Sequence, residues 1–333
     1  MIVGNLYFIK NTNGLFYYGA DYLRDQTDLI REILVRPALA EAARAMFPGV
    51  SIVTCENAHA LWHHAKQASH RGDVLYTPTP HPLPLIDRQW VVVHDAYPFL
   101  ASKGRLKRML LRLSLAMSRC RVAFINESET LGFVHALGVM PARLIFAPNK
   151  VADSDRPPRP ASPPALPLKV GLVGTDSSKK RYDELLQAVT AAGLQSSIEL
   201  CFYGHRTPYF EGVCQRHQEA CVTLQESDRC SLDDFLTSIH ALVSVADLEG
   251  FGRPIAAALT AGVPCLLRRK PVFQEFFSTA RFFDDTGSLV AALAEALRSG
   301  FPEQPPYSPP TRVREGFRSA SATLRSDGRS APR

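Results

Sequence analysis

The sequence predicts an α/β protein of two similar domains, and three observations support this prediction. Short apolar runs, such as WVVV at 90–93 and the run at 241–246, alternate with helical patterns along the chain. Strands that are continuously apolar are typical of parallel sheets with helices on both faces. The segment 153–167, DSDRPPRPASPPALP, interrupts this alternation and offers little to pack, so it predicts an extended linker. We expect a first domain at 1–151, a linker at 152–167, a second domain at 168–300, and a proline-rich segment with a polar, partly disordered tail at 301–333.

The individual elements follow from apolar periodicity and from the turn residues at their ends. In the first domain we expect strands at 2–9, 50–54, 74–76, 89–93, 121–126 and 143–147, and helices at 17–34, 57–69 and within 103–121. In the second domain we expect strands at 168–173, 197–203, 222–224, 241–246 and 263–267, and helices ending at 192 and at 232–239, 254–261 and 288–299. Two joined α/β halves make the cleft between them the expected binding site.

The composition excludes several classes of protein. With 333 residues, 46% of them apolar, the chain can form packed cores, which excludes a wholly disordered protein. No window reaches the roughly 18 consecutive apolar residues of a membrane-spanning helix, and MIVGNLYFIK lacks the basic start of a signal peptide. The seven cysteines show no CxxC pair and no zinc spacing, which indicates free thiols in a reducing compartment. We therefore expect a cytoplasmic protein, with at most peripheral contact to the inner face of the cytoplasmic membrane.

The net charge of +6 allows phosphorylated substrates, anionic lipid or nucleic acid as partners. Much of this excess lies in a stretch that begins at Lys103, ends at Arg121 and holds seven basic residues and no acidic one. Four apolar residues recur in it at helical spacing: Leu106, Leu110, Leu113 and Met117. Two interpretations stay open, namely a helix that lies on anionic lipid headgroups and a helix whose apolar stripe faces the core while its basic face is solvated. Nucleic acid is not expected, because no aromatic residue is interleaved with these charges.

The stretch DLEGFGRPIAAALTAGVP, at 247–264, has the outline of a phosphate site. It follows the apolar run at 241–246, and Gly250 and Gly252 break the chain before Pro254 starts a helix. Backbone N–H groups and the positive end of the helix dipole would point at this turn, so a diphosphate fits there with Glu249 beside it. The alternative is an ordinary connection between a strand and a helix.

Two further places are candidates for ligand contacts. The segment 174–181, GTDSSKKR, leads from a strand to a helix through Lys179 and Lys180, but it is neither a dinucleotide fingerprint nor a P-loop. His94 and Asp95 follow the strand at 89–93, where parallel sheets bind ligands, although Asp95 could equally cap a turn and His94 could be a structural group. Gly14, after the first strand, permits the close approach of a ligand or only a turn.

The piece EGFGRPIAAALTAGVP resembles the EGFGxPxxEAxxxGxP signature of the retaining GT-B glycosyltransferases of the family-4 type. Weaker matches occur in the right order in VVVHDAYP, INESE, APNKV and VGTDSSKKR. The resemblance implies two Rossmann-like domains that face each other across a cleft. It also implies transfer of a sugar from a nucleoside diphosphate sugar with retention of the anomeric configuration, by same-face attack and without a metal or other cofactor.

The resemblance also assigns roles to residues. It implies that Glu249 faces hydroxyls of the donor sugar, that Lys180 neutralises the leaving diphosphate, and that His94 touches the transferred sugar. The other implied donor-binding residues are Thr175, Lys179, Arg181, Gly204, Gly250, Phe251, Gly252, Arg253 and Pro254. Gly14 and Asp95 are implied to lie near the acceptor or the phosphates.

One departure from the signature affects the predicted function. The second glutamate of the motif, which holds the nucleotide ribose in the family, is Ala257 here. We expect a glycosyltransferase that acts on a polysaccharide, lipopolysaccharide or lipid-linked acceptor of bacteria. The alternatives are a catalytically degenerate GT-B protein that serves as a binding or scaffolding subunit, and a GT-B sugar epimerase, for which the signature supplies few acidic groups.

Overall fold

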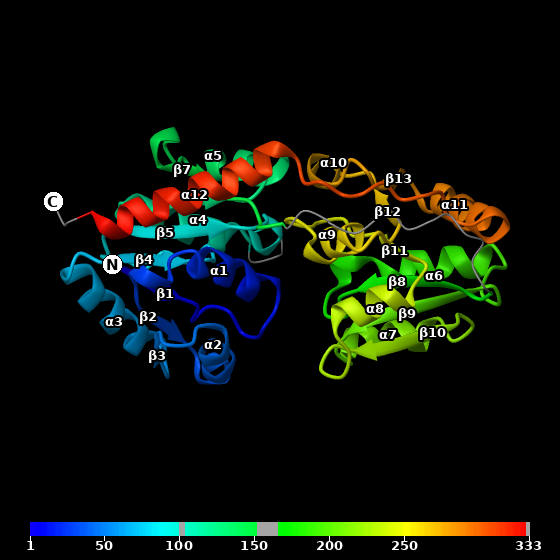
Figure 1. The fold of residues 1–333 in the computed structure, drawn as a ribbon, viewed down its shortest axis with the longest axis horizontal. Coiled ribbons are helices and arrows are strands. Elements are labelled where there is room, and N and C mark those ends of the chain that lie inside the picture. The colour runs from blue at the N-terminus through cyan, green and yellow to red at the C-terminus, as the bar shows by residue number, and fades with distance from the viewer. Residues whose placement is uncertain (100–103, 152–165, 331–333) are drawn as a thin grey trace. The chain divides into compact units, whose positions relative to one another are not determined.

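The computed structural model describes residues 1–99, 104–151 and 166–330 (Figure 1). The chain divides into two compact units, one formed by Met1–Lys150 with Pro310–Arg333 and the other by Val151–Pro309. Residues 152–165 of the predicted linker lie outside the described residues, as does Lys103 at the start of the predicted basic helix. The arrangement of the two domains about a shared cleft stays a prediction.

The first unit contains a seven-stranded sheet in the order β3-β2-β1-β4-β5-β6-β7, with every neighbouring pair parallel. Its strands are β1 Ile2–Asn5, β2 Ile30–Val35, β3 Ser51–Thr54, β4 Val74–Thr77, β5 Gln89–Val93, β6 Arg121–Phe124 and β7 Leu144–Phe146. Its α-helices in the described residues are α1 Gly14–Arg24, α2 Ala40–Met46, α3 Ala58–His70, α4 Gly104–Met117, α5 Gly132–Ala136 and α12 Thr311–Arg329. The parallel sheet predicted from continuously apolar strands is confirmed.

The helix predicted at 17–34 is wrong in its second half. α1 begins behind Asn13, whose side chain accepts a hydrogen bond from the Leu15 backbone N–H at 3.0 Å, and it ends at Arg24. Residues Ile30–Val35 form β2 instead, inserted between β1 and β3, and four of its six residues are buried. This apolar, partly β-branched run gains more from burial between two strands than from a helix, so tertiary packing overrides the local helical pattern.

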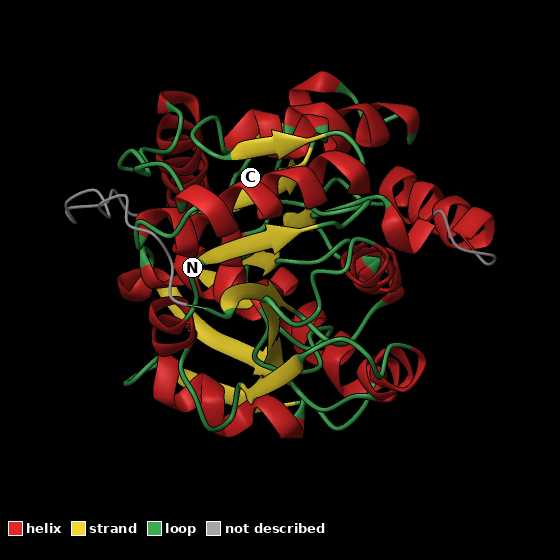
Figure 2. Cartoon of the chain, turned by 90° about the vertical axis from the view of Figure 1, so that its right-hand side faces the viewer, coloured by secondary structure: helices red, strands yellow, loops and turns green. Residues whose placement is uncertain are grey.

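Figure 2 shows helices, in red, on either side of the strands, in yellow. In the first unit, contacts place helices on both faces of the sheet. Val3 packs in one core cluster with Leu61 and Ala65 of α3. Adjacent residues of a strand point to opposite faces, and Ile2 points to the face that α12 covers. A Cβ added to Gly328 of α12 would lie only 2.7 Å from Ile2 Cγ1, so this helix approaches the sheet closely.

The tail expected to be disordered is a helix over most of its length. Val313, Phe317, Ala320 and Leu324 of α12 are buried, and they recur at the spacing that places them on one face. This single apolar stripe is hard to recognise in the sequence, because most residues of the tail are polar. The helix is stable because the first unit supplies a surface on which its apolar face is buried, and helices in proteins gain most of their stability from such packing.

Polar contacts fix α12 in register on the first unit. The Asp327 carboxylate accepts a hydrogen bond from Trp90 Nε1 at 2.9 Å and pairs with Arg121 Nε at 2.8 Å. Gln26 Nε2 donates to Ser321 Oγ at 2.7 Å. Residues near the end of the chain are therefore part of the first unit's core, which explains why this unit is built from both ends of the sequence.

The second unit contains a six-stranded parallel sheet in the order β10-β9-β8-β11-β12-β13. Its strands are β8 Leu168–Val173, β9 Ile198–Gly204, β10 Val222–Glu226, β11 Ala241–Ser244, β12 Cys265–Arg268 and β13 Arg281–Phe283. Its α-helices in the described residues are α6 Tyr182–Ala191, α7 Pro208–Arg216, α8 Leu232–Ser238, α9 Arg253–Thr260, α10 Pro271–Phe276 and α11 Thr286–Ser299. The predicted strands are all present, whereas α7, α10 and β13 were not predicted.

We predict that Leu324→Ala destabilises the first unit by about 2–4 kcal/mol, because it removes a fully buried side chain from the contact between α12 and the sheet. The chain has two tryptophans, Trp62 and Trp90, and both lie in the first unit, so their fluorescence during urea denaturation reports its unfolding. The control is Arg318→Ala on the exposed side of α12, which should change the free energy of unfolding by less than about 0.5 kcal/mol. Equal stabilities of the two variants would contradict the packing of α12.

Candidate functional site

The candidate site lies where two neighbouring strands of the second unit end. β8 and β11 pair in parallel at the centre of the sheet, so the loops that follow them leave from the same edge. The carboxyl edge of such a sheet is where open α/β domains bind ligands. The loop after β8 carries Lys180, and the loop after β11 carries Glu249.

The loop after β8 is held by its own hydrogen bonds. A short 3-10 turn, Ser178–Lys180, begins behind Ser177, whose hydroxyl accepts from the Lys179 backbone N–H at 3.4 Å. The Tyr182 hydroxyl lies 2.6 Å from the Gly174 carbonyl oxygen and 3.1 Å from that of Val173. Burial raises the pKa of Tyr182 well above its ordinary value, with smaller contributions from Tyr209 and nearby carboxylates, so the hydroxyl keeps the proton that it donates.

The loop after β11 ends with Gly250 and Gly252, just before α9. Gly252 is the residue before α9 and has φ +91°, a left-handed conformation that favours glycine. A Cβ at this position would also lie 2.8 Å from Ile255 Cδ1. α9 covers Arg253–Thr260, one residue earlier than predicted, so Pro254 stands in its first turn as expected.

Phe251 corrects one expectation. It was expected to line the sugar and the diphosphate, but its side chain is 3% exposed and its ring packs on Phe276 and Phe277, with centroids 4.7 and 5.5 Å away. Apolar burial therefore explains the aromatic residue of the motif, and only its backbone remains for a ligand. By anchoring the loop, Phe251 positions the neighbouring Gly250 and Gly252.

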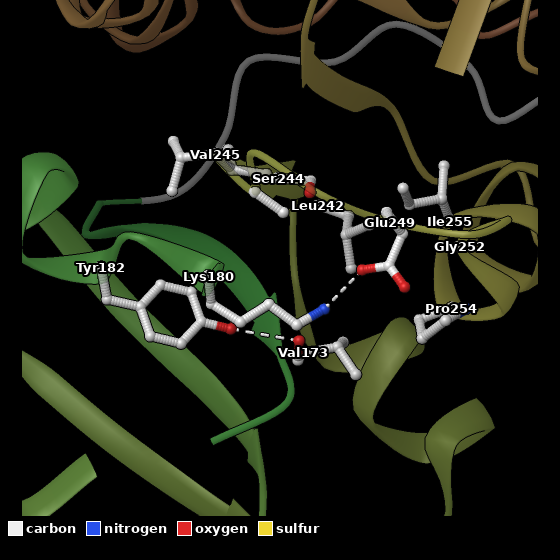
Figure 3. Close-up of a pocket in the computed structure, with 12 residues that line it drawn as sticks. Val173, Lys180, Tyr182, Leu242, Ser244, Val245, Glu249, Gly252, Pro254 and Ile255 are labelled. Carbon is white, nitrogen blue, oxygen red and sulfur yellow. Dashed lines mark hydrogen bonds and ion pairs between the residues drawn. The ribbon is translucent and has the colours of Figure 1, made fainter. Parts of the chain in front are cut away.

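Lys180 and Glu249 form the centre of the candidate site (Figure 3). Lys180 Nζ lies 2.9 Å from Glu249 Oε2, and the two side chains are only 17% and 19% exposed. Burial on its own would raise the pKa of Glu249, but the positive charges of Lys180 and Lys179 and the hydrogen bond from Lys180 outweigh it and hold this pKa below its ordinary value. The Glu249 carboxyl group is therefore ionised at neutral pH.

A small pocket surrounds this ion pair. Lys180, Tyr182 and Glu249 line it together with apolar residues from the ends of β8 and β11 and from the start of α9 (Figure 3). Its volume of about 20 Å³ is room for one water molecule. A diphosphate is much larger, so it would have to replace Glu249 as the partner of Lys180 or lie across the mouth of the pocket.

A second charged cluster beside the site was missed in the sequence. The Asp247 carboxylate accepts from Arg268 Nη1 at 2.9 Å and lies 3.2 Å from Lys270 Nζ, and it also pairs with Arg181. Burial would raise the pKa of Asp247, but these three cations hold it below its ordinary value. The sequence could have predicted this cluster, because Asp247 follows β11 and Arg268 and Lys270 lie at the end of the adjacent β12. The ends of these parallel strands share one edge of the sheet.

This cluster changes what can be expected of Arg181. The backbone of Arg181 is in the left-handed conformation, with φ 53°. Its guanidinium group binds the carboxylates of Asp247 and Glu184. Its charge is thus already compensated, whereas it was expected to assist at the diphosphate. The Asp247 backbone N–H also donates to the Lys179 carbonyl at 3.2 Å, so the cluster ties the two loops of the candidate site together.

Thr175 and Gly204 join the ends of β8 and β9. Thr175 is 2% exposed, and its hydroxyl donates to the His205 carbonyl at 2.6 Å. A Cβ at Gly204 would lie 2.5 Å from Thr175 Oγ1, so only glycine allows this approach. The Thr175 hydroxyl therefore serves the backbone in this structure. The contact of Gly204 with a nucleoside stays a prediction.

In the first unit, His94 and Asp95 follow β5 as predicted. His94 Nε2 lies 3.0 Å from the Pro78 carbonyl oxygen, and its ring packs edge-on against Tyr18 at a centroid distance of 4.5 Å. The Asp95 carboxylate accepts from the Tyr97 backbone N–H at 3.1 Å, which is the turn cap weighed as the alternative. Gly14 is the first residue of α1. The ligand contacts of these residues stay predictions.

Two other features are absent from the described residues. Among residues 1–99, 104–151 and 166–330, no three or more His, Cys, Asp or Glu side chains gather as they would around a metal ion. In the same ranges, no helix has both the length and the apolar character needed to cross a bilayer.

We predict that Lys180→Met raises the pKa of Glu249 above its ordinary value, because burial then acts without the nearest opposing charge. In the native chain the pair contributes stability above the ordinary carboxyl pKa and loses it as the pH falls through the lowered one. The variant should instead lose about 3 kcal/mol at neutral pH, where its buried carboxylate is unpaired. Carboxyl-carbon NMR titration, with Glu249→Gln for assignment, measures the shift.

The matched control is Arg281→Met, which breaks the ion pair between Arg281 and Glu295, 2.7 Å long, at the opposite edge of the same sheet. It should leave the pKa of Glu249 unchanged. A Glu249 pKa that does not respond to Lys180→Met would contradict the ion pair.

Part of the chain is similar to a known protein family. Residues 160–304 match the family Glycosyl transferases group 1. No curated protein has a sequence that matches the chain.

Three solved structures show the breadth of the similarity. The chain is similar to Anabaena Alr3699/HepE, solved in complex with UDP and glucose, with 14% identity, a TM-score of 0.70 and coverage of 98% of this chain and 97% of that chain. It is similar to WaaG, a glycosyltransferase involved in lipopolysaccharide biosynthesis, with 14% identity, a TM-score of 0.62 and coverage of 98% and 95%. A glycosyltransferase from Rickettsia africae ESF-5 gives 10% identity, a TM-score of 0.65 and coverage of 99% and 94%. The chain therefore has the GT-B fold, with two Rossmann-like domains, and its residues 160–304 are similar to the group 1 glycosyl transferases.

Proposed function

We propose that this protein is a glycosyltransferase that takes its sugar from a nucleoside diphosphate sugar. The observation that carries the proposal is the largely buried pair of Lys180 and Glu249, 2.9 Å apart, at the point where the loops after β8 and β11 leave the carboxyl edge of the sheet. Both residues lie inside the region that matches the group 1 glycosyl transferases. A similar fold in Anabaena Alr3699/HepE was solved with UDP and glucose bound, which supports the donor class.

The chemistry of glycosyl transfer fits these two residues. When the bond between the anomeric carbon and the diphosphate breaks, negative charge grows on the leaving group. A fixed ammonium group and the N–H groups at the start of α9 stabilise that charge more in the transition state than in the ground state. We propose that the diphosphate takes the place of Glu249 beside Lys180, which releases the Glu249 carboxylate to accept hydrogen bonds from sugar hydroxyls.

We further propose that the sugar is transferred with retention by same-face attack, as in the family-4 type. The acceptor hydroxyl oxygen forms the new bond to the anomeric carbon, the bond to the diphosphate breaks, and the hydroxyl proton goes to a phosphate oxygen. Glu249 is the only acidic residue that lines the described pocket, and the nearby Asp247 is held by three cations. A carboxylate nucleophile is therefore not needed in this scheme, and Lys180 with α9 supplies positive charge without a metal.

Other proposed contacts come from the resemblance. Lys179, Arg253 and Pro254 are partly exposed around the two loops, where they could reach the donor. For His94 we propose a contact with the transferred sugar, and the hydrogen bond between its ring and Pro78 would fix its orientation. Gly14 and Asp95 are proposed to lie near the acceptor or the phosphates.

The acceptor that we propose is a glycan or a lipid-linked glycan of a bacterial polysaccharide or lipopolysaccharide. Two proteins of similar fold support this class: WaaG, involved in lipopolysaccharide biosynthesis, and WaaB, a lipopolysaccharide outer core galactosyltransferase, with TM-scores of 0.62 and 0.55. A cytoplasmic location, with peripheral contact to the inner face of the membrane, fits such an acceptor.

Ala257 favours a second candidate function, that of a scaffolding subunit without catalysis. It lies on α9 and is partly exposed, so a glutamate there would meet no packing obstacle from burial. The absence of a glutamate at this position removes a hydrogen-bonding group that holds the ribose in the family-4 type. Against this candidate, a site without catalytic duty has no need to keep a lysine and a carboxylate paired and four-fifths buried, since such pairs add little net stability.

The test is turnover of a panel of nucleoside diphosphate sugars, followed by release of the nucleoside diphosphate. We expect one donor to be hydrolysed slowly in water, and we expect Lys180→Met and Glu249→Gln each to lower that rate by about 100-fold or more. The control Arg281→Met, which breaks an ion pair at the opposite edge of the sheet, should keep the native rate. Failure of every donor to bind to the folded protein would reject the enzyme and leave the scaffold.

A further inference from the structure

α4 carries a row of apolar side chains on its exposed surface. Leu106, Met109, Leu110, Leu113 and Met117 are 55%, 59%, 51%, 55% and 56% exposed. They recur at intervals of three and four residues, so they form one continuous stripe along the helix. We call these five residues the outer stripe.

The outer stripe lies on the side of α4 that points away from the core. Leu111 and Leu115 are the residues that pack into the first unit, with exposed fractions of 5% and 2%, and Gly104 is buried on the same side. At 3.6 residues per turn, these positions are about half a turn away from Leu106, Leu110 and Leu113. The interpretation in which the stripe of Leu106, Leu110, Leu113 and Met117 faces the core is therefore wrong.

Basic side chains flank the outer stripe. Arg105, Lys107, Arg108 and Arg112 are all exposed, and α4, Gly104–Met117, contains no acidic residue. On the helical wheel, Arg105 and Arg112 fall between the core side and the stripe on one flank, and Lys107 falls on the other. α4 thus has an apolar outer face with positive charge on both sides.

We propose that α4 binds the surface of a bilayer that contains anionic lipids, with the outer stripe inserted at the level of the acyl chains. The helix is too short to cross a bilayer, but an amphipathic helix that lies flat inserts its apolar face about 5–10 Å deep. Flanking Arg and Lys side chains then reach the lipid phosphates, as charge complementarity requires. A protein partner would have to offer an apolar surface rimmed only by acidic groups, whereas an anionic bilayer offers both everywhere on its surface.

This inference rests on the membrane contact included in the proposed function and deepens it by naming α4 as the surface that makes it. It depends on no residue of the candidate site. Binding to a membrane needs neither the donor nor catalysis. The two proposals can therefore fail separately: the turnover of a water-soluble donor tests the second unit, and lipid binding tests α4.

The test is co-sedimentation of the full chain with vesicles of phosphatidylglycerol and phosphatidylcholine in equal parts, and with vesicles of phosphatidylcholine alone. We expect binding to the anionic vesicles at low ionic strength, weaker binding in high salt, and at least about tenfold weaker binding to the neutral vesicles. These comparisons use only the native chain, so they stand even where a variant fails to fold.

Variants then separate the apolar and the charged contribution. Leu110→Gln/Leu113→Gln should weaken binding to anionic vesicles by about tenfold or more. Arg105→Gln/Arg112→Gln should weaken it by about thirtyfold and reduce its dependence on salt.

The controls match these changes outside α4. Leu85→Gln alters a leucine that is 72% exposed, and Arg298→Gln/Arg318→Gln removes the same charge from two exposed positions. Both should bind vesicles as the native chain does. All variants should keep their rate of donor hydrolysis.

Three results would overturn the proposal. One is the absence of binding by the native chain, and another is binding by Leu110→Gln/Leu113→Gln that equals binding by Leu85→Gln. The third is a lipid-free dimer, seen by analytical ultracentrifugation, that Leu110→Gln/Leu113→Gln converts to a monomer, because the outer stripe would then be covered by a second copy of the chain.

Discussion

The ion pair between Lys180 and Glu249 is the interaction on which the account of the site depends. Two opposite charges lie 2.9 Å apart in surroundings that expose less than a fifth of either side chain. Removing two charges from water is costly unless they stay close enough to attract each other. The loops after β8 and β11 must therefore be held in one geometry. Tyr182, Gly252 and the buried ring of Phe251 hold these loops, and the cluster around Asp247 joins them. Under the proposed function, a diphosphate that binds here would meet a cation that folding has already desolvated.

The two units solve different physical problems with the same kind of sheet. In the second unit, charge is concentrated at the carboxyl edge and compensated within the cluster of Arg181, Asp247 and Arg268. In the first unit, α12 returns from the end of the chain to cover one face of the sheet, and Asp327 fixes it to Trp90. α4 differs from these two regions. Leu111 and Leu115 already pack it against the core, yet its apolar outer stripe stays exposed. An uncovered stripe of this kind indicates a surface outside the chain.

The sequence was sufficient to predict the parallel sheets and most of their strands, because apolar runs are local signals, although β2 and β13 were not predicted. A specific motif also indicated the two loops that carry Lys180 and Glu249. The sequence was not sufficient where distant packing decides. The run at 30–35 continues a helical pattern, but pairing with β1 and β3 makes it a strand. The buried residues of α12 are few among many polar ones, so its apolar stripe was not recognised. The direction of the α4 stripe could not be read from spacing, since Leu106 and Leu111 both fit a helix and only the fold decides which one is buried. Asp247 was overlooked although it lies only two residues before the motif, because its three cations come from other elements.

The most direct measurement of the central claim is a crystal structure of the full chain with UDP bound. We expect the terminal phosphate to lie within hydrogen-bonding distance of Lys180 Nζ and of backbone N–H groups at the start of α9, and Glu249 no longer to bond to Lys180. We also expect the ribose hydroxyls to bind a group other than residue 257. UDP bound away from these loops, or bound while Lys180 and Glu249 remain 2.9 Å apart and do not touch it, would contradict the account.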